Sequence, residues 1–257
     1  MGVINVTPDS FSDGGLYLDP ERAIAHGEEL VRDGVEILDV GGESTRPGAE
    51  EVSVEEELRR VEPVVEGLAG GEAIISIDTS KSAVAEVALD AGAEIVNDVT
   101  ALRHDTEIAA LCAERGAGLV LMHMRGTPRT MQENPVYDDV VDDVKAFLAE
   151  RMEVAVSAGV DEGRIWLDPG IGFGKTLEHN LELLARLGEL RSLGCPLVVG
   201  TSRKSFIGKV DGSDPSERLG GTIASSVLAA AEGADVLRVH DVAEVGQAIE
   251  VAAAILG

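Results

Sequence analysis

The chain has few aromatic and few basic residues, and each shortage excludes a class of protein. Aromatic residues make up 3% of the 257 residues, too few to stack nucleic-acid bases or sugars across a surface. Lys and Arg number 21 against 47 Asp and Glu, so the formal net charge of −26 repels nucleic acid and anionic membranes. An anionic ligand must therefore meet a local cluster of Arg and Lys.

Cysteines and long apolar runs are also scarce. Cys112 and Cys195 form no C-x-x-C pair, so we expect neither a disulfide framework nor a zinc knuckle, as in a reducing cytoplasm. The sequence contains no run of about 18 apolar residues and no basic leader, so we expect a cytoplasmic protein without a membrane span. The acid-rich, lysine-poor composition indicates a surface adapted to a salt-rich cytoplasm.

What is present is an alternation of strands and helices. Short β-branched or aliphatic runs predict the strands Val3–Val6, Val35–Val40, Ala73–Ile77, Glu94–Val96, Gly118–Met122, Arg164–Leu167, Leu197–Gly200 and Val236–Val239. Apolar residues at three- and four-residue spacing predict the helices Pro20–Asp33, Val54–Leu68, Lys81–Ala91, Asp105–Arg115, Asp138–Ser157, Leu177–Arg191, Ser216–Ala231 and Ala243–Leu256. Such units predict an α/β protein, a single (β/α)8 TIM barrel over residues 1–257, with a doubly wound open sheet as the alternative.

Polar residues follow almost every predicted strand. They are Asn5, Asp39, Asp78, Asn97, His123, Asp168, Ser202 with Lys204, and Arg238 with His240. The turns that enter the strands are small and bland, as at Asp33 and Gly34. Because active sites in this fold lie at the C-terminal ends of the strands, we expect the site on that rim.

The segment Asp168–Thr176 is rich in glycine but matches neither common phosphate motif. Pro169 stands where a P-loop needs glycine, and Lys175 stands where a dinucleotide fingerprint needs its third glycine. Glycines at alternate positions permit either close approach to a flat ligand or an unusual turn around Phe173, and the sequence leaves both open.

Two early loops and two late segments are further candidates. Asn5–Gly15 and Gly41–Ala49 are long for βα connections, which favours active-site lids over solvated surface loops. Thr201–Gly208 places Arg203 and Lys204 directly after a strand, where they could hold an anion. Arg238–Asp241 adds an arginine and a histidine where barrels often bind phosphate, although a strand-end arginine also commonly pairs with a core carboxylate.

Metal-binding patterns are weak. No His, Cys or carboxylate set has the spacing of a structural metal site, which leaves a Mg²⁺ ion held partly by substrate phosphate. The acidic runs Glu55–Glu57 and Asp138–Asp143 predict solvated helix faces.

Taken together, the motifs resemble those of the dihydropteroate synthase family, the folate-pathway enzymes that sulfonamides target. The resemblance spans nearly the whole chain and rests on Asn5–Gly15, Gly42–Gly48, Ile77–Thr79, Asn97–Val99, Leu121–Met124, Asp168–Lys175, Ser202–Ser205 and Arg238–Asp241. It implies a barrel that condenses 6-hydroxymethyl-7,8-dihydropterin diphosphate with 4-aminobenzoate, releasing diphosphate and giving 7,8-dihydropteroate by a dissociative mechanism.

The resemblance also implies a set of site residues. The pterin would meet Asp78, Asn97, Met122, Asp168, Phe173, Gly200 and Lys204. Diphosphate would meet Asn5, Arg46, Arg238 and His240, with Asn5 positioning Mg²⁺. The aminobenzoate would meet Phe11, Thr45, Pro47, Lys204 and Ser205. Asp9 would stabilise a pterin methylene cation, which makes Asp9, Lys204, Arg238 and His240 the implied catalytic set.

Further expectations follow from the family. We expect a homodimer formed through helices late in the barrel, with small-molecule substrates as the other partners. The family commonly carries a β-hairpin before the first strand, and the sequence starts at Met1 within the first motif, which leaves an open barrel floor or a longer natural chain as alternatives.

Two other functions remain as alternatives. A pterin-dependent methyltransferase that serves a corrinoid protein shares the barrel but has no need of the Phe11 and Arg46 loops. A non-catalytic pterin-binding subunit has no need of intact Asp9, Lys204 and His240.

Overall fold

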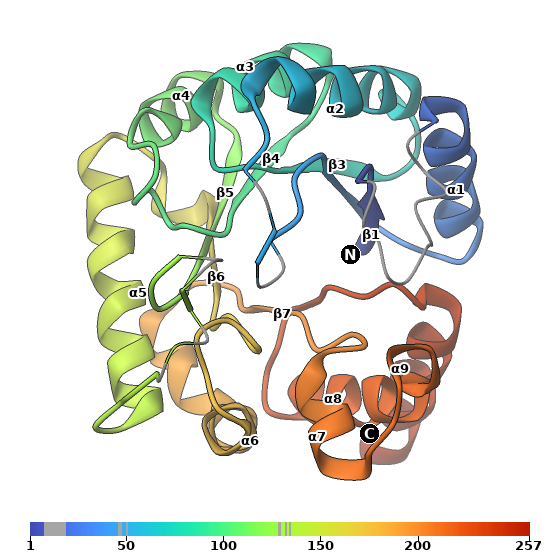
Figure 1. The fold of residues 1–257 in the computed structure, drawn as a ribbon, viewed down its shortest axis with the longest axis vertical. Coiled ribbons are helices and arrows are strands. Elements are labelled where there is room, and N and C mark those ends of the chain that lie inside the picture. The colour runs from blue at the N-terminus through green and yellow to red at the C-terminus, as the bar shows by residue number, and fades with distance from the viewer. Residues whose placement is uncertain (8–18, 46–47, 50, 128–129, 132, 134) are drawn as a thin grey trace.

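The structure is a computed structural model that describes residues 1–257 except 8–18, 46–47, 50, 128–129, 132 and 134 (Figure 1). All strands are parallel, and they pair in sequence order from β1 to β6, while β7 pairs with β8. The strands are β1 (Gly2–Asn5), β2 (Ile37–Gly41), β3 (Ile74–Asp78), β4 (Ile95–Asp98), β5 (Gly118–Met122), β6 (Ile165–Asp168), β7 (Val198–Val199) and β8 (Val236–Leu237).

Two single bridges close these strands into a ring. Leu167 of β6 bridges Leu197, directly before β7, and Gly2 of β1 bridges Val239, which follows β8. The N–H of Val239 also donates to the carbonyl of Met1 at 3.0 Å. The predicted (β/α)8 barrel is therefore confirmed, and the doubly wound sheet is excluded.

Helices surround the barrel (Figure 1). They are α1 (Pro20–Arg32), α2 (Val54–Leu68), α3 (Ser82–Ala91), α4 (Glu107–Arg115), α5 (Val140–Ser157), α6 (Leu177–Ala185), α7 (Ser205–Asp211), α8 (Leu219–Ala231) and α9 (Val242–Leu256). Short 3₁₀ helices occupy Glu162–Arg164, Leu187–Leu193 and Pro215–Glu217. No helix among the described residues is both long enough and apolar enough to cross a membrane.

Acidic residues fix where some helices begin. Asp19 caps α1, whose first residue is Pro20. Asp139 accepts the N–H groups of Val141 and Asp142 at 2.9 and 3.0 Å, and so starts α5. The prediction of a solvated face is wrong for Glu57, which is fully buried on α2 because Lys81 supplies a counter-charge at 2.5 Å.

Three late helices differ from the prediction. The predicted helix Leu177–Arg191 is divided, because Arg186 leaves helical geometry at φ −117° and Gly188, a weak helix former, follows. The predicted Ser216–Ala231 begins only at Leu219, after a 3₁₀ turn. Helix α7 is an additional helix, whose 7 residues are too few for periodicity to reveal.

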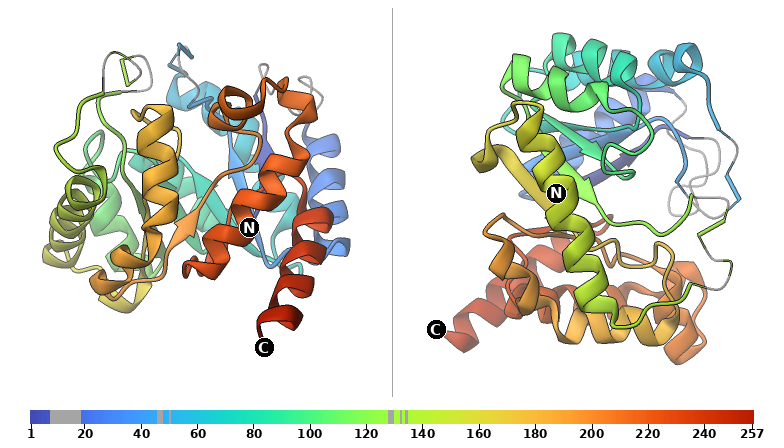
Figure 2. Two further views of the ribbon diagram at one scale, coloured as in Figure 1. Left: turned by 90° about the horizontal axis from the view of Figure 1, so that it is seen from below. Right: turned by 90° about the vertical axis from the view of Figure 1, so that its left-hand side faces the viewer.

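The barrel interior is apolar in its lower part and polar above. Ile37, Ile95, Val120 and Val198 form a small core that is separate from the large core between strands and helices. Two residues further along the same strands, the register places Asp39 and Asn97, whose side chains bond to each other. The loops that follow the strands gather at this polar end, and α9 ends at the opposite end (Figure 2).

Candidate active site

A cavity of about 760 Å³ opens at the C-terminal ends of the strands, on the predicted rim. Its volume falls in the range of small-molecule sites. Its lining includes eight of the residues that sequence analysis selected: Asn5, Thr45, Asp78, Phe173, Lys204, Ser205, Arg238 and His240.

Arg238 joins three strands at the floor of the cavity. Its Nε donates to Asp39 Oδ2 at 2.6 Å, and its Nη2 donates to Asp78 Oδ2 at 2.9 Å. Asn97 Nδ2 donates to the same Asp39 oxygen at 3.1 Å. Asp39, which is fully buried, therefore orients both Arg238 and Asn97. Sequence analysis placed Asp39 at a strand end but gave it no role.

The Arg238 guanidinium bonds both the Asp39 and the Asp78 carboxyl groups. Burial and these neighbouring charges together determine the pKa of Asp78. Burial raises the pKa of Asp78 to about 8; the attraction of Arg238 opposes this shift, and the charge of Asp39 adds to it. Although burial opposes it, Asp39 and Asp78 hold the pKa of Arg238 above its ordinary value. Arg238 therefore stays charged, while burial favours the protonated form of Asp78, which could donate a hydrogen bond.

Asp168 ends β6 beneath the glycine-rich segment. Its Oδ1 accepts the N–H of Gly170 at 2.7 Å. Burial raises the pKa of this carboxyl, and the attraction of Lys204 opposes the rise. A buried carboxylate in this position can accept neighbouring N–H donors of a flat ligand.

The glycine-rich segment requires its glycines. Gly170 has φ +67°, and a Cβ there would lie 1.9 Å from the carbonyl oxygen of His123. Gly172 has φ +85°, and a Cβ there would lie 3.1 Å from Lys204 Cδ. Gly172 and Phe173 also line the cavity. The interpretation as a special turn is therefore confirmed, and the segment also forms a wall of the cavity, while its approach to a flat ligand stays a prediction.

Lys204 lies between the glycine-rich segment and the floor. Its Nζ donates to the carbonyl of Ile171 and lies 4.7 Å from the centroid of the Phe173 ring. Burial lowers the pKa of Lys204 to about 8, although the attraction of Asp168 opposes the shift. The amine is therefore positioned to bond a ring edge beside the aromatic face.

Cations gather on this side of the cavity despite the acidic composition of the chain. Arg203, Lys209 and Arg218 line it together with Arg238 and His240. This cluster is the local positive region that an anionic ligand needs in a protein of net charge −26.

Neighbouring side chains orient His240 and one of these cations, Arg203. Ser202 Oγ lies 2.9 Å from His240 Nδ1 and accepts the N–H of His240 at 3.2 Å. Arg203, at φ +52°, bonds Asp241 through Nε and Nη2 at 3.0 and 2.5 Å. Arg203 is thus paired with a carboxylate. The pairing of a strand-end arginine with core carboxylates, which the sequence left as an alternative for Arg238, is observed in its bonds to Asp39 and Asp78.

Sequence analysis missed Lys175, which supports the site from below. Its side chain is 1% exposed, and Nζ lies 2.9 Å from His123 Nδ1, 2.9 Å from the Gly170 carbonyl and 3.1 Å from the Phe173 carbonyl. Burial lowers the pKa of His123 to about 2, and the charge of Lys175 lowers it further, so His123 is neutral and can accept. Lys175 therefore holds the turn that carries Phe173.

The remaining predicted residues lie beneath the cavity or outside the described residues. Asn97, Met122 and Asp168 are buried below it, and a Cβ on Gly200 would lie 3.6 Å from Lys204 Nζ. Four predicted site residues fall outside the described part of the chain: Asp9, Phe11, Arg46 and Pro47.

No group of three or more His, Cys, Asp or Glu residues arranged to hold a metal occurs among the described residues. Asn5 lines the cavity and offers one amide oxygen, a hard ligand that suits Mg²⁺ when substrate phosphates supply the others. The residues present therefore fit a weakly held Mg²⁺ ion.

Comparison with known proteins identifies the family. The sequence profile of the pterin binding enzymes matches residues 1–240. The dihydropteroate synthase of Escherichia coli K12 is 50% identical over 257 residues, which cover 100% of this chain and 91% of that protein. The chain belongs to the dihydropteroate synthase family. It is thus an enzyme, a transferase of folate biosynthesis.

Solved structures agree with this assignment. The Yersinia pestis dihydropteroate synthase in complex with a sulfonamide drug has a TM-score of 0.97 at 45% identity. The match covers 100% of this chain and 93% of the Y. pestis chain. The Xanthomonas albilineans enzyme with 4-aminobenzoic acid has a TM-score of 0.93 at 48% identity, covering 100% and 92% of the two chains. The same enzyme with 7,8-dihydropteroate has a TM-score of 0.89 at 45% identity, covering 100% and 93%.

Proposed function

We propose that this dihydropteroate synthase family member joins 6-hydroxymethyl-7,8-dihydropterin diphosphate to 4-aminobenzoate, and that diphosphate leaves before the amine attacks. The observation that carries the proposal is that Lys204, Arg238 and His240 line the cavity, while buried Asp168 interacts electrostatically with Lys204 and Arg238. In the proposal, Asp168, Asn97 and Lys204 form the pterin floor, and the side lined by Arg203, Lys209 and Arg238 is the cationic wall. The X. albilineans complexes with 4-aminobenzoic acid and 7,8-dihydropteroate support these substrate classes.

The pterin occupies the floor in this proposal. Its edge carries adjacent N–H donors that Asp168 accepts, while Asn97 and the Lys204 amine bond the neighbouring ring atoms. Asp78, whose protonated form burial favours, donates to a ring acceptor. Phe173 packs against the ring face, and Met122 and Gly200 complete the pocket.

Diphosphate lies against the cationic wall. Arg238 and His240 bond its oxygens, together with Arg46, which lies outside the described residues. Asn5 would hold Mg²⁺ with the diphosphate oxygens, and the ion would neutralise part of the charge that accumulates on the leaving group.

The reaction then takes place at the pterin methylene carbon. The C–O bond breaks and its electron pair leaves with diphosphate, while the carboxylate of Asp9 stabilises the resulting cation. The aminobenzoate lies against Phe11 and Pro47, near Thr45, with Lys204 and Ser205 bonding its carboxylate. Its nitrogen lone pair forms the C–N bond, and the ammonium proton passes to solvent, since attack on a cation by a weakly basic aniline needs no general base.

A secondary isotope effect tests the order of these steps. Dihydropterin diphosphate carrying deuterium on its methylene carbon is compared with the protiated substrate by competitive kcat/KM measurement. A cation forms with rehybridisation of that carbon, so the account predicts a clear normal isotope effect. A value indistinguishable from unity would show concerted displacement and contradict the dissociative order.

A further inference from the structure

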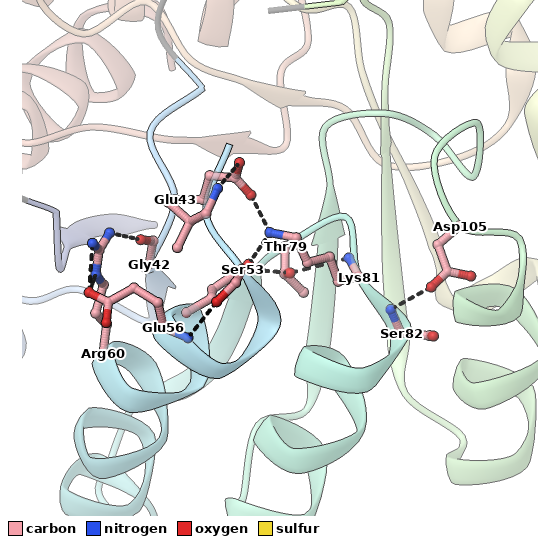
Figure 3. Close-up of polar contacts among 11 residues, drawn as sticks. Gly42, Glu43, Ser53, Glu56, Arg60, Thr79, Lys81, Ser82 and Asp105 are labelled. Atoms are coloured by element: carbon pink, nitrogen blue, oxygen red, sulfur yellow. Dashed lines mark hydrogen bonds and ion pairs between the residues drawn. The ribbon is translucent and has the colours of Figure 1, made fainter. Parts of the chain in front are cut away.

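A buried ionic network lies beside the active site and has no role in the proposed function (Figure 3). Lys81, directly before α3, places its Nζ 2.5 Å from Glu57 Oε2 and 2.5 Å from Glu43 Oε2. The side chain of Glu57 is 0% exposed and that of Lys81 is 9% exposed. The network therefore connects α2, the start of α3 and the loop that follows β2.

Glu43 closes the loop that follows β2 at its base. Its Oε2 accepts a hydrogen bond from Lys81 Nζ. Its Oε1 accepts the N–H of Val52, nine residues further along the chain, at 3.2 Å. One carboxylate thus links the Lys81 amine to the backbone of Val52. Ser44 and Thr45, the residues next to Glu43, line the 760 Å³ cavity and also a second cavity of about 510 Å³. Glu43 itself also lines both cavities, so its orientation affects the lining that these three residues share.

Hydrogen bonds also fix the residues that surround Glu43. Thr79 Oγ1 donates to Glu57 Oε1 at 2.7 Å, and the N–H of Lys81 donates to Thr79 Oγ1 at 3.3 Å. Arg60 Nη1 donates to the carbonyl of Gly42 at 2.8 Å, which fixes the backbone directly before Glu43. The backbone directly before Glu43 is therefore bonded to Arg60, and the Lys81 ammonium that the Glu43 side chain contacts is bonded to Glu57.

The charge balance of the network depends on Lys81, whose single positive charge faces two carboxylates. Although burial opposes it, the hydrogen bonds that Lys81 donates to the Glu43 and Glu57 carboxylates raise the pKa of Lys81, so the amine stays charged. Removal of the ammonium would leave two carboxylates facing each other across a largely buried gap. Removal of Glu43 alone would leave a balanced Lys81–Glu57 pair.

We propose that Lys81 and Glu43 are positioning residues that hold Ser44 and Thr45 at the binding place of 4-aminobenzoate. The inference rests on the proposed function, which places that substrate near Thr45. The pterin ring is assigned to residues on β3, β4 and β6, outside this loop, so its contacts should be unaffected. Arg46, which is assigned to diphosphate, follows Thr45 directly, so the test of pterin binding uses a pterin without diphosphate.

Glu43→Ala is the first test, because it leaves the buried Lys81–Glu57 pair balanced. We expect the KM for 4-aminobenzoate to rise by about tenfold or more, while the Kd for 6-hydroxymethyl-7,8-dihydropterin, which lacks diphosphate, and the melting temperature stay close to wild type. Glu51→Ala removes an exposed carboxylate from the same loop and serves as the matched control, with unchanged kinetics. An unchanged aminobenzoate KM in Glu43→Ala overturns the proposal.

A double-mutant cycle tests whether Lys81 acts through Glu43. Lys81→Met should raise the KM for 4-aminobenzoate at least as much as Glu43→Ala does, and Glu43→Ala/Lys81→Met should show no further rise. Multiplied effects in the double variant would show that the two residues act separately and would overturn the coupling. Should Lys81→Met fold poorly, Glu43→Ala still decides the proposal.

Thr45→Ala separates this inference from the proposed function. If Thr45→Ala raises the aminobenzoate KM and Glu43→Ala does not, the substrate placement stands and the positioning role fails. If neither variant changes that KM, both fail. If both raise it, both are supported.

Discussion

At the scale of single residues, the site depends on a few buried charged side chains. Lys204 is the one that a substitution tests most directly. Lys204→Ala should lower kcat/KM for dihydropterin diphosphate by about 10- to 150-fold, since a charge-assisted hydrogen bond contributes about 1.5–3 kcal/mol. The fold should be retained, because burial lowers the pKa of this amine and its charge does not stabilise the folded state. Lys145→Ala on α5 is the control; unchanged turnover in Lys204→Ala would remove this lysine from the site.

The pKa of about 8 for Lys204 also predicts an alkaline limit to activity. The ammonium form is present below pH 8 and is lost as pH rises through that value, so kcat/KM for the pterin should fall above pH 8. In Lys204→Arg the side chain stays charged, so the part of this decline that comes from Lys204 should disappear even if the rate is lower. Asp78 ionises in the same range. A decline that persists in Lys204→Arg but disappears in Asp78→Asn would assign it to Asp78 instead.

Sequence patterns identified the residues assigned to ligand binding. They did not identify the residues that orient them. Asp168, Lys204 and Arg238 follow strands in recognisable motifs, and the structure brings them together. Asp39 and Lys175 were assigned no role, because their partners, Arg238 and His123, lie 199 and 52 residues away in the chain. Hydrogen bonds between such distant residues leave no local spacing in a single sequence.

At the scale of elements, the turn after β6 tests how tightly the pterin floor is built. Gly170→Ala places a Cβ 1.9 Å from the His123 carbonyl at φ +67°, whereas Gly116→Ala meets nothing within 4 Å at φ +61°. Gly116→Ala should cost about 1 kcal/mol of unfolding free energy. Gly170→Ala should cost several times more in urea denaturation. Equal losses in the two variants would show that close packing at Gly170 contributes nothing.

Elements with strong periodicity were predictable and short ones were not. Helix α2 was predicted with its observed bounds, Val54–Leu68, because its apolar positions repeat over four turns between clear boundary signals. Strands β7 and β8, of two residues each, are shorter than predicted. Their ends are fixed by pairing across the barrel, which no local pattern records.

At the scale of the whole molecule, an apolar face on α8 and α9 indicates self-association, and we propose a homodimer. Leu228, Val251 and Ile255 are exposed by 63%, 55% and 78%. Light scattering should give twice the mass of one chain for the wild type and one chain for Leu228→Glu. Val210→Glu on α7 changes a residue with the same 63% exposure and should stay dimeric. A monomeric wild type at high salt would contradict the proposal.

The net charge of −26 acts on the molecule as a whole. Carboxylates repel one another over its surface at low ionic strength, and salt shortens the range of that repulsion to about 3 Å at 1 M. We therefore expect activity and folding to improve from low salt towards molar KCl. A single local site could not produce such a broad dependence, since its own ion pairs weaken with salt.

Product formation from dihydropterin diphosphate, radiolabelled 4-aminobenzoate and Mg²⁺, followed from low to molar KCl, tests the central claim most directly. The account predicts labelled 7,8-dihydropteroate with stoichiometric diphosphate, formed faster as KCl rises. No labelled product at any KCl concentration, from protein shown to be folded and to bind the pterin, would contradict it.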